Sequence, residues 1–211
     1  MAEKRKICVV IGSVPVGENP FEGRDRNKYF VICADGGYDN AVKFGIVPDL
    51  LIGDFDSVRS SLPDGVETIR LKVEKDETDT MAAVEEGMKC GCREFELYGI
   101  IGGERFDHSF ASLCTLQYIS MQGCKAVIIS DKLRIFLLNG GKLMLKGIKG
   151  STVSVFPFGC ASCEVSYSGL KYPLEHARLC SENALGVSNC ACSDNAEVIV
   201  HSGNALVIVQ K

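Results

Sequence analysis

The stretch that decides the fold is Ile46-Val47-Pro48-Asp49-Leu50-Leu51-Ile52-Gly53-Asp54-Phe55-Asp56-Ser57. Its apolar residues predict a short strand, and two carboxylates one residue apart follow that strand. Side chains at positions i and i+2 of an extended chain point the same way. We therefore expect Asp54 and Asp56 to converge on one point, with Phe55 turned into the core.

Two carboxylates that lie this close repel each other unless a cation lies between them or one of them stays protonated. Neither immediate neighbour of the pair is basic, so an external cation is the simplest remedy. Oxygen ligands suit Mg²⁺, which usually shares its coordination shell with substrate phosphates. The pair therefore predicts a magnesium site that also holds a phosphorylated ligand.

Length and charge restrict the possible classes of protein. A chain of 211 residues forms one large domain or two small ones. The net charge of −4 provides no basic surface, which argues against nucleic acid as a partner. The apolar run that follows Lys6 is too short for a signal peptide or a membrane span, so we expect a cytoplasmic protein without membrane contact.

The eleven cysteines fit the same interpretation. In a reducing cytoplasm they would act mostly as small hydrophobic side chains. The spacing Cys160-x-x-Cys163 and the pairs Cys90/Cys92 and Cys190/Cys192 invite a zinc interpretation. No part of the chain has the paired CxxC spacing of a structural zinc site, so we do not expect one.

The pattern of apolar residues changes near Asp131. Before it, strand and helix patterns alternate, which predicts an α/β domain with a Rossmann-like parallel sheet over residues 1–131. The expected strands are 6–11, 29–34, 49–52, 68–73, 95–98 and 125–130, and the expected helices are 38–44, 79–90 and 107–121.

After Asp131, short strand patterns predict an all-β sandwich over residues 132–211. The expected strands are 133–138, 142–145, 152–156, 163–167, 196–201 and 205–210. We expect turns at Asn139-Gly140-Gly141 and at Ser202-Gly203-Asn204.

Three more segments follow predicted strands of the first domain, at the edge where ligands of open α/β sheets bind. They are Asp35-Gly36-Gly37, Lys75-Asp76-Glu77-Thr78-Asp79 and Gly102-Gly103-Glu104-Arg105-Phe106-Asp107-His108. Glycines let the backbone approach a ligand closely, and the basic side chains of the second and third segments suit phosphate oxygens. Taken singly, Asp79 and Asp107 are helix caps or ligands, with Thr78 as the other candidate cap of the helix at 79–90. His108 is an ordinary helix-start residue or a site residue.

Taken together, these segments predict a site in which metal and basic side chains hold a polyphosphate. The chain contains neither GxxxxGK[ST] nor GxGxxG, so neither a P-loop nor a dinucleotide-binding fingerprint is present.

As a set, the motifs resemble those of the bacterial-type thiamine pyrophosphokinases. The residues that carry the resemblance are 34–37, 45–49, 53–57, 75–79, 102–108, Gly169-Leu170-Lys171-Tyr172-Pro173-Leu174 and Gly186-Val187-Ser188-Asn189. The resemblance implies transfer of pyrophosphate from ATP to thiamine, with release of AMP. It also implies a homodimer whose active site lies between subunits, with ATP and Mg²⁺ on the first domain and thiamine on the partner's second domain.

The resemblance also implies roles for individual residues. Asp54, Asp56 and Asp79 correspond to Mg²⁺ ligands, and Asp35 and Asp76 to close supports of the metal–ATP site. Arg105 and Asp107 correspond to residues at the reacting groups. Gly36, Gly37, Lys75 and His108 belong to the nucleotide side of the site. Ser188 and Asn189 correspond to the thiamine-binding pair, with Tyr172 near it.

Two other functions share some of these features. A pterin pyrophosphokinase has a comparable acidic edge and uses a different alcohol. A sensor of nucleotide or thiamine diphosphate could keep the scaffold without catalysis, although such a protein would be expected to have lost carboxylates that are all present here.

Overall fold

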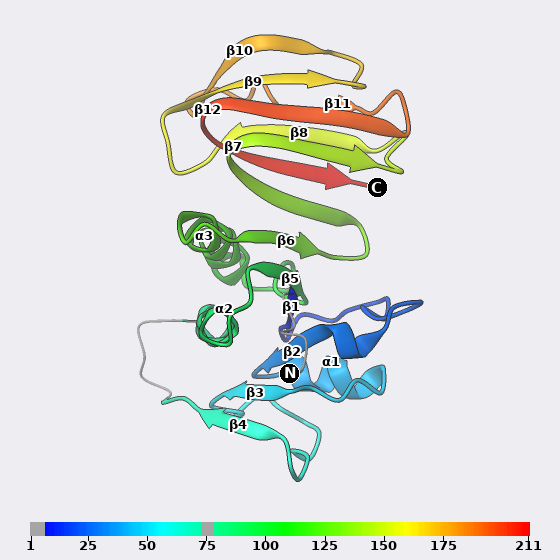
Figure 1. Cartoon of the computed structure of the whole chain (residues 1–211), viewed down its shortest axis with the longest axis vertical. Coiled ribbons are helices and arrows are strands. Elements are labelled where there is room, and N and C mark those ends of the chain that lie inside the picture. The colour runs from blue at the N-terminus through cyan, green and yellow to red at the C-terminus, as the bar shows by residue number, and fades with distance from the viewer. Residues whose placement is uncertain (1–6, 73–77) are drawn as a thin grey trace. The chain divides into compact units, whose positions relative to one another are not determined.

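The structure is a computed structural model that describes residues 7–72 and 78–211. The chain folds into two compact units, Met1–Asp131 and Lys132–Lys211 (Figure 1). No helix within the described ranges is long and apolar enough to cross a membrane.

The first unit is built on six parallel strands. Their order across the sheet is β6-β5-β1-β2-β3-β4. The bounds are β1 Ile7–Ile11, β2 Tyr29–Ala34, β3 Leu50–Gly53, β4 Glu67–Arg70, β5 Glu94–Tyr98 and β6 Lys125–Ile129. Each of the six predicted strands is therefore present, with ends displaced by a few residues at most.

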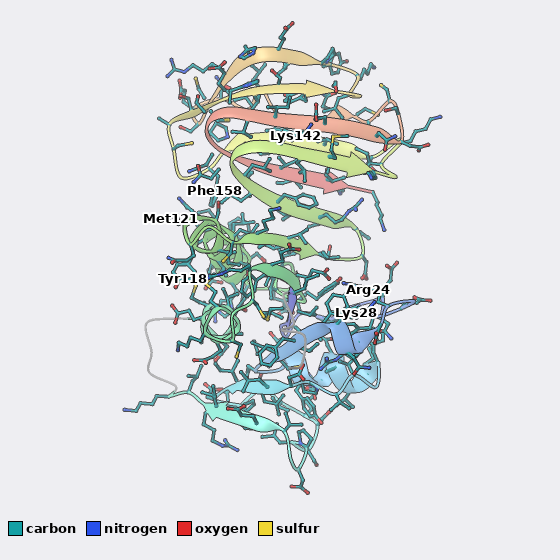
Figure 2. All side chains as sticks on the ribbon, viewed as in Figure 1. Arg24, Lys28, Tyr118, Met121, Lys142 and Phe158 are labelled. Carbon is teal, nitrogen blue, oxygen red and sulfur yellow. The ribbon has the colours of Figure 1, made fainter. Side chains whose placement is uncertain are left out.

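Three α-helices and one short 3₁₀ helix connect these strands. They are η1 Arg26–Lys28, α1 Gly37–Lys43, α2 Asp79–Lys89 and α3 Phe106–Met121. Tyr118, which Figure 2 labels, donates its hydroxyl to Glu85 at 3.0 Å and so joins α3 to α2. The three predicted helices are confirmed, whereas η1 was not predicted.

The strand order reverses beside β1. The chain proceeds from β1 through β2 and β3 to β4 in one direction, whereas β5 and β6 lie on the other side of β1. The loops after β1 and β5 meet closely here, because Gly12 donates to the Tyr98 carbonyl and Val14 to the Gly99 carbonyl, both at 2.8 Å. The carboxyl edge at such a reversal is where open α/β sheets bind ligands.

The second unit contains only β-strands. Their bounds are β7 Leu133–Lys146, β8 Thr152–Pro157, β9 Ser162–Ser168, β10 Leu174–Cys180, β11 Asn189–Cys190 and β12 Asn195–Gln210. All pairs within this unit are antiparallel, and β12 pairs with β7 along most of its length. Valines from three strands, among them Val153, Val165 and Val198, are completely buried between them.

The turns expected at Asn139-Gly140-Gly141 and Ser202-Gly203-Asn204 are wrong. Both segments lie inside the long strands β7 and β12, which bend there (Figure 1). Gly140, Gly141 and Gly203 have φ values of 71°, 83° and 74°, and the β7–β12 register shifts between Val200 and Asn204. The first half of β12 pairs with β9 and the second half with β8, so the bend lets one strand serve two sets of partners.

All eleven cysteines lie within the described residues, and none forms a disulfide. Five of them are buried: Cys8, Cys33, Cys92, Cys124 and Cys163. Burial raises the pKa of the Cys33 thiol to about 12, because a thiolate would lose its solvation there. These five thiols act as small core side chains. Cys160 and Cys180 are only partly buried, and four more are exposed (Cys90, Cys114, Cys190 and Cys192), so the expectation that the cysteines are mostly core side chains holds for five of the eleven.

Candidate functional site

A cavity of about 760 Å³ lies in the first unit, at the carboxyl edge of its parallel strands. The loops after β1, β2, β3 and β5 line it, together with the first residues of α2 and α3. Six of the predicted site residues are in its lining: Asp35, Asp54, Asp56, Asp79, Arg105 and His108. Its size is within the range typical of small-molecule sites.

The acidic loop, residues 53–57, forms one wall. It is not extended, because β3 ends at Gly53 and Phe55 has a left-handed φ of 63°. The Asp56 amide donates to Asp54 Oδ1 at 3.1 Å, which closes a turn. The expectation that strand alternation aligns the two carboxylates is therefore wrong, and a tight turn brings them together instead.

Phe55 lies on the other side of this turn. Its ring packs partly buried against the hydrophobic core of the first unit, and the Arg70 guanidinium lies 5.4 Å from the ring centre. A left-handed backbone is costly for a bulky residue, and the packing of the ring offsets part of that cost. Phe55 thus anchors the acidic loop, although it is only half-buried.

Asp35 holds the acidic loop from the end of β2. Its Oδ1 accepts a hydrogen bond from the Phe55 amide at 3.1 Å, and its Oδ2 accepts one from the Ser57 hydroxyl. Its own amide donates to the Ile52 carbonyl at 2.8 Å. The oxygens of Asp35, Asp54 and Asp56 lie within 4.8 Å of one another.

Within residues 7–72 and 78–211, these three carboxylates are the one group of His, Cys, Asp or Glu side chains that lie close enough to bind a metal ion together. The sequence interpretation grouped Asp79 with Asp54 and Asp56, and the structure brings Asp35 close to that pair as well. Asp79 lines the same cavity from the start of α2. Thr78 caps that helix by accepting a hydrogen bond from the Met81 amide at 3.2 Å, so the cap is Thr78 and not Asp79.

Repulsion within this group raises the pKa of Asp56. Asp54 is the main cause of a raised pKa at Asp56, followed by desolvation and by the charge of Asp35, and Asp79 adds to the effect. A cation among the three carboxylates would relieve this repulsion. Oxygen donors from several carboxylates are a ligand set that fits Mg²⁺.

Arg105 and Asp107 form an ion pair at the start of α3. Arg105 Nε donates to Asp107 Oδ1 at 3.2 Å, and Arg105 Nη2 donates to Oδ2. Arg105 lowers the pKa of Asp107, which makes this carboxylate a weaker base. Arg105 lines the cavity, whereas Asp107 is absent from the lining.

The adjacent glycines of the β2–α1 turn, Gly36 and Gly37, serve packing between segments of the chain. A Cβ on Gly37 would lie 1.9 Å from the Ile11 carbonyl oxygen, and one on Gly36 would lie 3.0 Å from both Ser13 Cβ and Ser57 Oγ. Neither residue is in the cavity lining. Lys75 and Asp76 fall outside the described residues.

Sequence reasoning missed the β1 loop, residues 12–16. Gly12, Ser13, Val14 and Pro15 all line the cavity. The available signal was Gly12-Ser13 directly after the first predicted strand, at the same edge as the acidic residues. These residues carry no charge, so a search for ionisable groups passed over them.

The candidate thiamine residues in the second unit play different structural parts. Asn189 is buried, and its Oδ1 accepts from the Tyr172 amide at 3.0 Å and from the Cys190 amide at 2.9 Å. Its Nδ2 donates to the Tyr172 carbonyl at 2.7 Å. The Tyr172 side chain is 60% exposed, and Ser188 has a left-handed φ of 58°. Asn189 therefore holds the backbone of Tyr172 in place, while the Tyr172 side chain remains exposed.

Two family models match the chain. They are described as the catalytic domain of thiamin pyrophosphokinase, over residues 24–128, and as its vitamin B1 binding domain, over residues 142–207. The thiamine pyrophosphokinase of Bacillus subtilis (strain 168) is 26% identical over 164 residues, which span 75% of this chain and 76% of the relative. Thiamine pyrophosphokinase 1 of Oryza sativa subsp. japonica is 26% identical over 188 residues, which span 75% of this chain and 70% of that protein.

Solved structures share the fold. The crystal structure of thiamine pyrophosphokinase from Bacillus subtilis matches with a TM-score of 0.87 and 21% identity, covering 98% of this chain and 99% of the other. Thiamin pyrophosphokinase from Candida albicans matches with a TM-score of 0.77 and 16% identity, covering 98% and 89%. The arrangement of strands and helices described above is therefore one that these enzymes also adopt.

Proposed function

Because this chain belongs to the thiamine pyrophosphokinase family, we propose that it transfers pyrophosphate from ATP to the hydroxyl of thiamine, giving thiamine diphosphate and AMP. The observation that carries this proposal is the group of carboxylates at Asp35, Asp54 and Asp56, which lines the cavity at the carboxyl edge of the sheet. A divalent cation there would hold a polyphosphate against that edge.

The proposed Mg²⁺ ligands are Asp54, Asp56 and Asp79, which line one cavity, with Asp35 supplying further negative charge beside the ion. Bound Mg²⁺ would neutralise charge on the phosphate oxygens. Asp35 would also position Asp54 and Asp56, because its carboxylate accepts hydrogen bonds from Phe55 and Ser57 of the same loop. Asp76 and Lys75 remain proposed supports of the same metal–ATP site.

Arg105 would stabilise the charge that grows on AMP as its bond to the transferred group breaks. Phosphoryl and pyrophosphoryl transfers depend on in-line positioning and on neutralisation of oxygen charge more than on a strong base. The lowered pKa of Asp107 suits a residue that orients Arg105 better than one that removes the thiamine proton. His108 lines the same cavity as Arg105 and would belong to the nucleotide side of the site.

We further propose that residues 1–131 form the ATP- and Mg²⁺-binding catalytic domain, with a Rossmann-like sheet. Residues 132–211 would form a β-sandwich that binds thiamine. The strand order with a reversal at β1 supports the first assignment, and the change of partners along β12 supports the second. Tyr172 and Ser188 would contact thiamine, and Asn189 would hold Tyr172 in place.

The enzyme is proposed to act in the cytoplasm as a homodimer whose active site uses residues of both subunits. Light scattering of the purified protein tests this assembly. A mass of one chain at the concentrations used for activity assays would overturn the dimer.

The decisive experiment incubates the protein with ATP, MgCl₂ and thiamine and measures the products by mass spectrometry. We expect equal amounts of thiamine diphosphate and AMP, and none when EDTA replaces Mg²⁺. A parallel reaction with a hydroxymethyl pterin tests the related activity. AMP release with the pterin alone, or formation of ADP instead of AMP, would overturn the proposed function.

A further inference from the structure

Asn40 is a buried polar residue on α1 that the proposed chemistry does not use. Its Nδ2 donates to two carbonyls of the β1 loop, Gly12 O at 2.8 Å and Val14 O at 2.9 Å. Its Oδ1 accepts from the Val16 amide at 3.2 Å. One side chain thus fixes three backbone groups of the loop that forms a wall of the cavity.

Most backbone groups of the β1 loop, residues 12–16, already have hydrogen-bond partners. The amides of Gly12 and Val14 donate to the Tyr98 and Gly99 carbonyls, and their own carbonyls accept from Asn40. Pro15 has no amide hydrogen. Within the part of the chain that the structure describes, the Ser13 amide and hydroxyl have no hydrogen-bond partner.

Ser13 is exposed and lines the cavity. It also lies near the acidic loop, because a single Cβ added to Gly36 would be 3.0 Å from both Ser13 Cβ and Ser57 Oγ. An amide and a hydroxyl on one residue are two donors suited to the oxygens of a phosphate. These donors therefore line the same cavity as the carboxylates that would hold the cation.

We propose that Ser13 binds a phosphate of the nucleotide through its amide and hydroxyl, and that Asn40 is the residue that positions Ser13. This inference rests on the proposed function, because it assumes that a polyphosphate enters this cavity. Ser13 would supply hydrogen bonds on the side of the phosphate chain that faces β1. Among the described residues, the β1 loop contributes Gly12, Ser13, Val14 and Pro15 to the cavity lining, and none of these is basic.

Lys43 provides a matched control. It lies one helical turn after Asn40 on α1, and its Nζ donates to the Val16 carbonyl at 2.7 Å. Val16 is buried in the core and does not line the cavity. Lys43→Met therefore removes a tether from α1 to the same loop without touching the segment that presents Ser13.

The test measures KM for ATP, KM for thiamine and kcat for Ser13→Ala, Asn40→Asp, the double variant and Lys43→Met. The Asp side chain keeps the volume and one acceptor oxygen but turns a second oxygen toward the Gly12 and Val14 carbonyls. We expect Ser13→Ala and Asn40→Asp each to raise KM for ATP by about fivefold or more, since a hydrogen bond to a charged group is removed or misplaced. KM for thiamine should stay within about twofold, because its site lies elsewhere.

The double variant should be no worse than Asn40→Asp alone, because both changes remove one contact. Lys43→Met should keep the wild-type KM for ATP. An unchanged KM for ATP in Ser13→Ala, or additive effects in the double variant, would overturn the inference. If Asn40→Asp does not fold, Ser13→Ala still decides whether the contact exists.

Binding of a non-hydrolysable ATP analogue with Mg²⁺, measured by calorimetry on the same variants, separates this inference from the proposed function. If the wild-type protein binds the analogue but forms no thiamine diphosphate, the proposed function fails. The Ser13 contact is then judged by whether Ser13→Ala weakens that binding. If the wild-type protein does not bind the analogue, both fail.

Discussion

The acidic loop of the first unit and the Ser188-Asn189 pair of the second unit use polar side chains in opposite ways. Asp54 and Asp56 face a cavity, and their mutual repulsion raises the pKa of Asp56. The Asn189 amide is buried, and its hydrogen bonds to the backbone of Tyr172 and Cys190 stabilise the fold.

This difference shows that residues predicted to form one active site can have different roles, either binding a ligand or stabilising the fold. Residues that repel each other need a ligand, whereas a residue with satisfied hydrogen bonds acts on a ligand only through its neighbours. The two roles make opposite predictions for stability and activity, so substitutions can separate them.

The largest effect is expected at Asp54. In Asp54→Asn the amide oxygen can still accept the Asp56 amide, so the turn should remain, but the charge that holds the cation is lost. We expect kcat to fall at least about a hundredfold, or ~2.7 kcal/mol of transition-state stabilisation. Steady-state kinetics and circular dichroism measure activity and fold separately.

Asp39→Asn is the matched control for that substitution. The Asp39 carboxylate accepts from the Arg59 and Ser60 amides at 3.0 Å and 2.9 Å and does not line the cavity. Its loss should leave kcat near the wild-type value. The metal role of Asp54 is wrong if Asp54→Asn retains more than about a tenth of wild-type kcat, which is less than ~1.4 kcal/mol.

Asn189→Ala should show the reverse pattern. It leaves the Tyr172 amide and carbonyl without their partner, and we expect the free energy of unfolding to fall by about 1–3 kcal/mol. KM for thiamine should rise because Tyr172 loses its support, while KM for ATP stays unchanged. Urea unfolding and kinetics measure the two effects.

Asn183→Ala is the control for Asn189, because Asn183 is exposed and its side chain accepts one bond from the Leu185 amide at 3.3 Å. A loss of stability as large in Asn183→Ala would show that burial of the amide does not matter. A rise in KM for ATP in Asn189→Ala would contradict the separation of the two roles.

Arg105→Lys tests a residue between these two extremes, since Arg105 both lines the cavity and pairs with Asp107. Lysine keeps the charge but loses the planar set of donors. We expect kcat to fall about tenfold with little change in melting temperature, because an exposed ion pair contributes little to stability. A clear drop in melting temperature with normal kcat would assign Arg105 to the fold instead.

The parallel strands were predictable because β-branched runs alternate with helix patterns, as in Ile7–Ile11 and Tyr29–Ala34. The continuity of β7 and β12 could not be predicted, because a glycine such as Gly140 or Gly203 occurs in a β-bulge as readily as in a turn. Strand β10 escaped prediction because Glu175, His176 and Arg178 interrupt its apolar residues, and Leu179 is its one buried residue.

The carboxylates of the site were predictable from their positions at strand ends. Their exact grouping was not, because the place of Asp35 beside Asp54 and Asp56 depends on the left-handed φ of 47° at Asp35 itself. Asn40 gave no signal, since a polar residue inside a short helix normally faces water. Only the packing of α1 against the β1 loop shows that it is buried.

The smallest effect is expected for Asp56→Asn, and it tests most directly whether the acidic loop differs from Asn189. The raised pKa of Asp56 means that folding disfavours its charged form. Ionised Asp56 therefore lowers stability at neutral pH, and this cost disappears as the pH falls through the raised pKa. Without Mg²⁺, Asp56→Asn should raise the melting temperature at pH 7, and the gain should shrink near pH 4.

Added Mg²⁺ should raise the melting temperature of the wild-type protein more than that of Asp56→Asn, because the ion binds the folded wild-type carboxylates more tightly. Scanning fluorimetry with and without EDTA measures both differences. A lower melting temperature of Asp56→Asn in EDTA would mean that Asp56, like Asn189, is held by favourable contacts. The acidic loop would then be a stabilising element of the fold, and its proposed role as a cation site would lose its physical basis.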